Sequence, residues 1–194
     1  MINIVNPKKF RNRVYSKMNK RILVFGVSGI GKTTACQDYA NHHKGVKHIS
    51  AGKILSESDV PHQSSEKALG YKEILTRQEC LSRKINQLEK EHPYKDFIID
   101  AHSFVESQDT IVNIPTRIIS MLKPSSIILL ELDPESVLAR IKDSSRKRPT
   151  HRLVELMWHI HITRINVVNY AREIEVPLKI IEADCKDCIS AHAH

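Results

Sequence analysis

The chain has 194 residues, of which 41% are hydrophobic and 27% charged. This composition excludes a disordered chain and suits one globular domain. No stretch approaches the roughly 20 apolar residues of a membrane helix, and residues 1–6 lack the pattern of a secretory signal. Four dispersed cysteines argue against a disulfide framework and predict a cytoplasmic protein.

A basic leader over residues 1–20 is predicted to precede a domain that spans residues 21–194. The net charge is +8, and the first 21 positions hold seven of the basic residues: Lys8, Lys9, Arg11, Arg13, Lys17, Lys20 and Arg21. Two interpretations stay open, a solvated tail or a contact with RNA or DNA. Only Phe10 and Tyr15 accompany these charges, so the segment offers little surface for stacking on bases.

Predicted strands and helices alternate along the chain. A strand at 21–25 is followed by a helix at 32–43, a strand at 46–49, helices at 51–58 and 66–91, and a strand at 97–100. A helix at 115–122, a strand at 126–132, helices at 134–144 and 153–173, and a strand at 178–181 complete the order. The strands are apolar almost throughout, which is typical of parallel strands covered on both faces. The pattern predicts a three-layer α/β fold, with a five-stranded parallel sheet between helices and ligands beyond the carboxyl ends of the strands.

The turn after the first strand satisfies the pattern G-x-x-x-x-G-K-[ST] in its predicted context between a strand and a helix. Glycines let the backbone approach phosphate oxygens, and amide groups at the helix start face the negative charge. Lys32 supplies a cation for the β- and γ-phosphates, and the Thr33 hydroxyl is suited to Mg²⁺. The candidate ATP-binding residues are Gly26, Val27, Ser28, Gly29, Ile30, Gly31, Lys32, Thr33 and Thr34.

Asp100 ends the third predicted strand, at the same edge of the sheet as the phosphate loop. A carboxylate in this position is suited to the magnesium shell, so Thr33 and Asp100 are the candidate metal residues. A turn-capping role for Asp100 is the alternative. His102, in the loop that follows, is expected to face the same cleft.

Several motifs together resemble the archaeal-type adenylate kinases, over roughly residues 21–183. The phosphate loop alone is shared by many families, but its ordered combination with further motifs is more specific. These motifs are Ser50-Ala51-Gly52, Asp100-Ala101-His102-Ser103, the stretch from Leu122 to Glu131, the stretch from Ala139 to Arg148, and the later helix that contains Arg164.

The resemblance implies a P-loop kinase fold with a small insertion that binds a nucleoside monophosphate and a short lid. It implies transfer of a phosphoryl group from ATP to a nucleoside monophosphate, with AMP as the first expectation and with Mg²⁺. By this resemblance the acceptor would contact Ser50, Ala51, Gly52, His102 and Ser103. Arg146 and Arg148 would clamp the migrating group from the lid, assisted by Arg140, because forked guanidinium donors match phosphate oxygens.

The chain also departs from the family pattern. Lys53 follows Gly52, and Ser56 stands where these enzymes often carry an arginine, a cation that Arg77 would supply from the long helix. Two other functions therefore stay open. One is a regulatory ATP-binding module that acts through a protein or nucleic acid, and the other is a kinase of a polynucleotide end or a small hydroxyl substrate.

Two further groups of residues have other interpretations. Cys185, Cys188, His192 and His194 have the ligand types of a zinc site, although a single Cys-x-x-Cys at the end of a chain is a weak signal. His159 and His161 are two apart on a helix and should face different sides. Met157 and Trp158 are predicted to lie in the core.

Overall fold

The computed structural model describes residues 19–57, 71–107, 110–143 and 152–183. Its centre is a five-stranded sheet in the order β2-β3-β1-β6-β7, formed by Val46–Ser50, Asp96–Asp100, Arg21–Phe25, Ser126–Glu131 and Leu178–Glu182. Every neighbouring pair of strands is parallel. The five-stranded parallel sheet predicted from the sequence is therefore confirmed.

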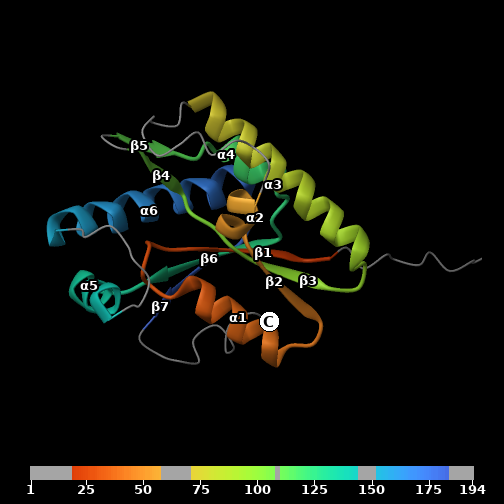
Figure 1. Cartoon of the computed structure of the whole chain (residues 1–194), viewed down its shortest axis with the longest axis horizontal. Helices are drawn as coiled ribbons and strands as arrows, with labels where there is room; N and C mark the ends of the chain where they lie inside the picture. Colours follow the sequence, from red (N-terminus) through yellow and green to blue (C-terminus); the bar gives the residue numbers. More distant parts are fainter. Residues whose placement is uncertain (1–18, 58–70, 108–109, 144–151, 184–194) are drawn as a thin grey trace, which may run out of the picture.

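Helices cover both faces of the sheet. Figure 1 shows α1 (Lys32–His42) and α5 (Pro134–Asp143) on one side. On the other side lie α2 (Ala51–Glu57), α3 (Tyr71–Glu91), α4 (Thr116–Met121) and α6 (Leu153–Ile174). The boundaries agree with the predicted ones to within one or two residues, except that the helix predicted from residue 66 is described only from Tyr71 onward.

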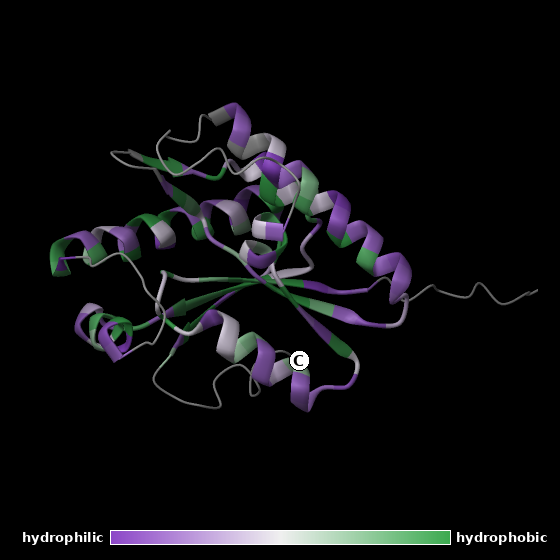
Figure 2. Ribbon diagram, in the orientation of Figure 1, coloured by the Kyte–Doolittle hydropathy of each residue, from purple (hydrophilic) through white to green (hydrophobic). Residues whose placement is uncertain are grey.

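Successive side chains of β1 point to opposite faces of the sheet, and the hydrophobic core is accordingly divided into two clusters. Leu23 and Phe25 join the cluster that packs under α3, α4 and α6, whereas Ile22 and Val24 join the cluster that packs against α1 and α5. All five residues of β1 are buried, as expected of a central parallel strand. Figure 2 shows the hydrophobic colour strongest along the central strands, whereas the helices carry both colours.

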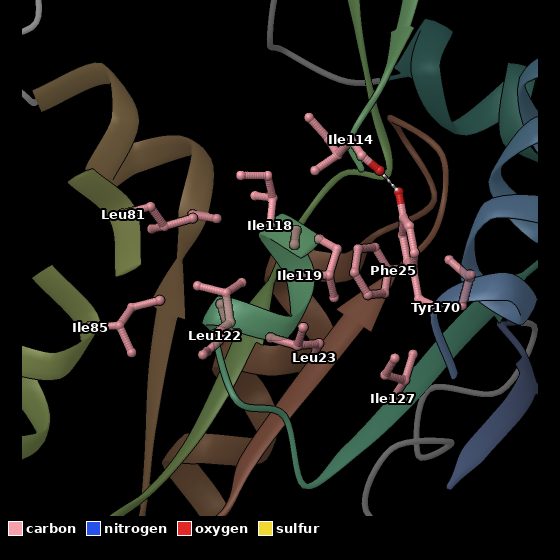
Figure 3. Packing of buried hydrophobic residues seen from close by; sticks show 14 of the residues in the cluster. Leu23, Phe25, Leu81, Ile85, Ile114, Ile118, Ile119, Leu122, Ile127 and Tyr170 are labelled. Atoms are coloured by element: carbon pink, nitrogen blue, oxygen red, sulfur yellow. Dashed lines mark hydrogen bonds between the residues drawn. The ribbon is translucent and has the colours of Figure 1, made fainter. Parts of the chain in front are cut away.

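The sequence analysis did not predict a small second sheet. Its strands β4 (Phe104–Ser107) and β5 (Thr110–Asn113) pair antiparallel and lie on the same side of the main sheet as α6. Tyr170 of α6 holds the base of this hairpin, because its buried hydroxyl donates to the carbonyl oxygens of Ser103 and Ile114. Figure 3 shows the Tyr170 ring beside Phe25 with its hydroxyl directed at Ile114.

The predicted burial of Met157 and Trp158 is wrong. Both side chains are more than half exposed, at 52% and 57%. The face that α6 buries carries Leu156, His159, Thr163, Val167 and Tyr170. The prediction that His159 and His161 face different sides is confirmed, since His159 is buried and His161 is exposed.

Candidate active site

The phosphate loop begins where β1 ends, beside the neighbouring strand β6. Gly26 has a φ of +152°, and a Cβ atom there would lie 2.9 Å from the carbonyl oxygen of Leu130 and 3.1 Å from a methyl group of Ile30. Gly31 precedes α1 with a φ of +104°. Only glycine adopts these angles without strain and leaves room for the close approach to β6. The loop geometry thus follows directly from the glycine spacing in the sequence.

Lys32 is the first residue of α1 and is buried. Its Nζ donates to the carbonyl oxygens of Gly26 at 2.7 Å and Val27 at 3.0 Å, which holds the ammonium group inside the loop. Thr33 follows in the first turn of α1, where backbone amides lack partners within the helix. The loop therefore combines a fixed cation with a helix N-terminus, an arrangement suited to polyphosphate.

Arg140 reaches the phosphate loop from α5. One of its terminal nitrogens donates to the carbonyl oxygen of Ile30 at 3.0 Å, and the other donates to that of Ala183, after β7, also at 3.0 Å. The guanidinium group therefore ties the loop to the end of the last strand and adds positive charge beside the expected phosphates. The structure places Arg140 against the loop itself, next to Gly31.

Asp100 lies at the end of β3, in register with Val24 of β1 and Ser50 of β2. Its carboxylate accepts hydrogen bonds from His48 Nε2 at 2.7 Å and from Ser50 Oγ at 3.1 Å. Burial by itself raises the pKa of Asp100, but the hydrogen bond and charge of His48, the hydrogen bond from Ser50 and the charge of Lys32 together lower it below the usual value. The group is thus an oriented carboxylate that stays ionised at neutral pH.

A cavity of about 290 Å³ opens beside the phosphate loop. Val27 and Ser28 of the loop form one wall, and Ala51, Gly52 and Leu55 of α2 form another. The rest of the lining comes from α3, the segment after β3, the hairpin, α4 and α6. These residues are Gln78, Leu81, Ala101, His102, Phe104, Val105, Glu106, Ile114, Ile119, Leu122, Leu156 and His159.

The five predicted acceptor residues fall into two groups. Ala51, Gly52 and His102 line the cavity beside the loop. Ser50 directly precedes Ala51, and its hydroxyl donates to the carboxylate of Asp100. Ser103 is buried, with 2% of its surface exposed, and its carbonyl oxygen accepts from Tyr170. Ser50 and Ser103 are therefore not among the described residues that line the cavity.

The sequence analysis missed several residues that line or support this site. Phe104 and Glu106 come from the unpredicted hairpin, and Gln78 comes from α3. His159 reaches the cavity from α6, where its Nδ1 lies 3.5 Å from a carboxylate oxygen of Glu106. Two short β-favouring runs around Gln108 and Asp109 are a signal for the hairpin that could have been used. The pairing of His48 with Asp100 gives no local sequence signal, because it depends on the register of β2 against β3.

Arg77 was expected to supply a cation to the acceptor site. In the structure it lies 3.8 Å from Glu73 on the same helix. It is not among the residues that line the cavity, as far as the described chain extends.

Several predicted features lie outside the described residues. These are the basic leader up to residue 18, the lid arginines Arg146 and Arg148, and the cysteines and histidines of the candidate zinc site. No group of three or more His, Cys, Asp or Glu side chains that could hold a metal ion is found among the residues that the structure does describe.

Comparison with known proteins agrees with this geometry. The family model described as AAA domain matches residues 25–156. The adenylate kinase of Methanopyrus kandleri is 27% identical over 169 residues, which are 83% of this chain and 87% of that protein. The adenylate kinase of Pyrobaculum aerophilum is 30% identical over 152 residues, which are 74% of this chain and 75% of that protein. This chain belongs to the adenylate kinase-like family of P-loop kinases.

A solved structure extends the comparison at the level of the fold. A sugar kinase from Janibacter superposes with a TM-score of 0.54 at 16% identity, covering 86% of this chain and 87% of that chain. The predicted P-loop kinase fold is therefore confirmed. The matching family model and the adenylate kinase relatives show that the protein is a kinase of the nucleotide-binding P-loop class. None of the helices in the described ranges is long and apolar enough to cross a membrane.

Proposed function

We propose that the protein transfers a phosphoryl group from ATP to a nucleoside monophosphate, with AMP as the first candidate. The observation that carries this proposal is the cavity that shares Val27 and Ser28 with the phosphate loop. A second substrate in this cavity would lie directly beside a nucleotide held by the loop. Phosphoryl transfer requires mainly such positioning, together with neutralisation of charge.

The chemistry of the cavity wall favours a nucleoside over a polyhydroxy substrate. Most of its lining residues are apolar, with Leu55, Phe104 and Ile119 among them. Apolar walls suit the flat faces of a base, whereas a sugar needs many polar partners. The adenylate kinase names of the relatives point in the same direction. AMP is therefore the acceptor to test first.

The residues proposed to bind the phosphoryl donor, ATP, lie in the phosphate loop and around it. Residues 26–34 would hold the phosphates of ATP, and Lys32 would neutralise charge between the β- and γ-phosphates. Arg140, already bonded to the carbonyl oxygen of Ile30, would add positive charge beside the loop. Arg146 and Arg148, which lie outside the described residues, are assigned to the lid by family resemblance alone.

Thr33 and Asp100 are the residues that would hold Mg²⁺. A hydroxyl and an ionised carboxylate are oxygen donors of the kind that Mg²⁺ prefers, and such sites use one or two protein ligands with phosphate oxygens and water. The hydrogen bonds from His48 and Ser50 leave Asp100 oriented, and its lowered pKa keeps it charged. Bound Mg²⁺ would neutralise phosphate charge during transfer.

The test is formation of ADP from ATP and Mg²⁺ with each common nucleoside monophosphate, and with shikimate and gluconate as non-nucleotide acceptors. Strong stimulation by one monophosphate, AMP before the others, is the expected result. Slow hydrolysis that no acceptor changes would reject the proposal and favour the regulatory ATPase. Stimulation only by shikimate or gluconate would reject a nucleoside monophosphate as the acceptor, but the protein would still be a kinase.

A further inference from the structure

Helix α6 carries apolar side chains on the face that it turns to solvent. Val154 is 75% exposed, Met157 52%, Trp158 57%, Ile165 47% and Val168 41%. They follow one another at steps of three, one, seven and three residues, which at 3.6 residues per turn places all five within an arc of about 100° on one side of the helix. Figure 2 shows hydrophobic and hydrophilic residues interspersed along the outer end of α6. We name these five residues together with the exposed His161 the α6 face.

The opposite face of the same helix is buried against the rest of the domain. It includes His159 and Thr163, which have 8% and 3% of their surfaces exposed. A surface helix normally directs its apolar side inward and its polar side to water. Helix α6 has apolar residues on both sides. A helix with this pattern is usually buried on both sides, and here the domain itself buries only one.

The exposed area is large enough for a specific interface. From their exposed fractions, the five apolar residues of the α6 face leave about 500 Å² of surface in water, most of it from apolar side-chain atoms. A standard interface buries about 800 Å² on each partner, of which somewhat more than half is apolar. The α6 face thus supplies about the apolar area that one side of a stable dimer needs.

We infer that the α6 face binds the α6 face of a second copy of this chain, in an antiparallel, two-fold symmetric dimer. The sequence spacing is self-complementary about His161. In an antiparallel pair centred there, Val154 faces Val168 of the other copy, Met157 faces Ile165, and His161 faces its own counterpart. Trp158 faces the exposed Arg164 at the edge of the face, where a guanidinium group stacks favourably on an indole ring. The six positions carry no Lys, Arg, Asp or Glu, so two copies meet without like charges in contact.

His161 fits the centre of such an interface. It is the one polar position within the α6 face, and its ring centroid lies 6.1 Å from that of Trp158 on the preceding turn. A single polar residue in an apolar helix seam fixes register, because any slipped pairing buries it against apolar groups. The apolar residues of the α6 face before and after His161 then supply the apolar contacts of the interface.

Sedimentation velocity of the full chain tests the proposal, from about 1 to about 100 μM. The expected result is a dimer whose fraction rises with concentration and does not fall when salt is raised, since the contact is apolar. Ile165→Glu should weaken dimerisation at least about 100-fold, because symmetry places two unpaired charges in the interface. Tyr94→Glu is the matched control, since Tyr94 is 94% exposed and lies outside α6.

The fluorescence of Trp158, the only tryptophan in the chain, gives a local readout. Its emission should shift to the blue and its quenching by acrylamide should fall as the dimer forms. His161→Cys, in a chain with Cys80, Cys185 and Cys188 changed to Ser, should form an intermolecular disulfide on mild oxidation. Glu175→Cys in the same background is the control, because it lies beyond the end of α6 and should not cross-link.

Three results would overturn the inference. The first is a monomer over the whole concentration range. The second is a dimer that Ile165→Glu leaves unchanged, because its interface would lie elsewhere. The third is a Trp158 that is shielded from acrylamide at every concentration and becomes accessible when residues 1–18 are deleted, because the α6 face would then be covered by the chain's own leader.

Discussion

If the cavity holds the acceptor as proposed, adding one methyl group at Gly52 should affect acceptor binding and leave ATP binding unchanged. Gly52 lies in the first turn of α2 and lines the cavity, and a Cβ atom there would meet no protein atom within 4 Å. Gly52→Ala should therefore fold without a clash. Because alanine restricts the unfolded chain and favours helix, the variant should gain up to about 1 kcal/mol of stability.

The same methyl group should weaken acceptor binding. The cavity of about 290 Å³ is at the lower limit for small-molecule sites, so little space is left over for an added group. Overpacking of this kind costs about 1–3 kcal/mol, which corresponds to about a 5- to 150-fold loss in kcat/KM for the monophosphate. ATP affinity should stay the same, because the phosphate loop is unchanged.

The assay is steady-state ADP formation at varied AMP, with ATP affinity measured by calorimetry and stability by thermal unfolding. Gly45→Ala is the matched control, since its Cβ would also meet open space and Gly45 does not line the cavity. It should gain similar stability and keep the acceptor KM. An unchanged acceptor KM in Gly52→Ala would refute the assignment of this cavity to the acceptor.

Three further substitutions probe the donor side. Lys32→Ala should lower kcat for ADP formation at least about 100-fold, because it removes charge neutralisation at the transferred group. The circular dichroism spectrum of the variant should stay that of the wild type. Normal turnover would reject the proposed role of the phosphate loop. Gly26→Ala should cost about 2–4 kcal/mol in urea unfolding, since its Cβ would lie 2.9 Å from the Leu130 carbonyl oxygen at a strained φ, and a wild-type midpoint would contradict this. Asp100→Asn should remove an acid-sensitive part of the stability: the lowered pKa of Asp100 stabilises the fold above the unfolded value of about 3.9, and this stabilisation is lost as pH falls through the folded pKa. The difference in unfolding free energy between wild type and Asp100→Asn should therefore shrink below about pH 4, and a constant difference would contradict the assignment.

Local sequence was sufficient for the sheet and the phosphate loop. The three central strands β1, β3 and β6 are short apolar runs, so their burial on both faces and their parallel pairing could be predicted from composition. The edge strands β2 and β7 carry charged or polar residues and are only partly buried. The loop is determined by glycines at positions where a side chain would clash or be strained. The place of Asp100 at the carboxyl edge of the sheet, where ligands bind, was predicted in the same way, and its role as a metal ligand stays a prediction.

Only the tertiary structure showed the contacts between residues that are far apart in the sequence. His48 contacts Asp100 only because β2 lies beside β3 in one register, and Arg140 reaches the Ile30 carbonyl oxygen across 110 positions in sequence. The walls of the cavity come from α2, α3, α4, α6 and the hairpin, which no local motif brings together. The exposure of Met157 and Trp158 was also decided at this level: apolar composition predicts burial, but the packing of α6 determines which of its faces meets the sheet.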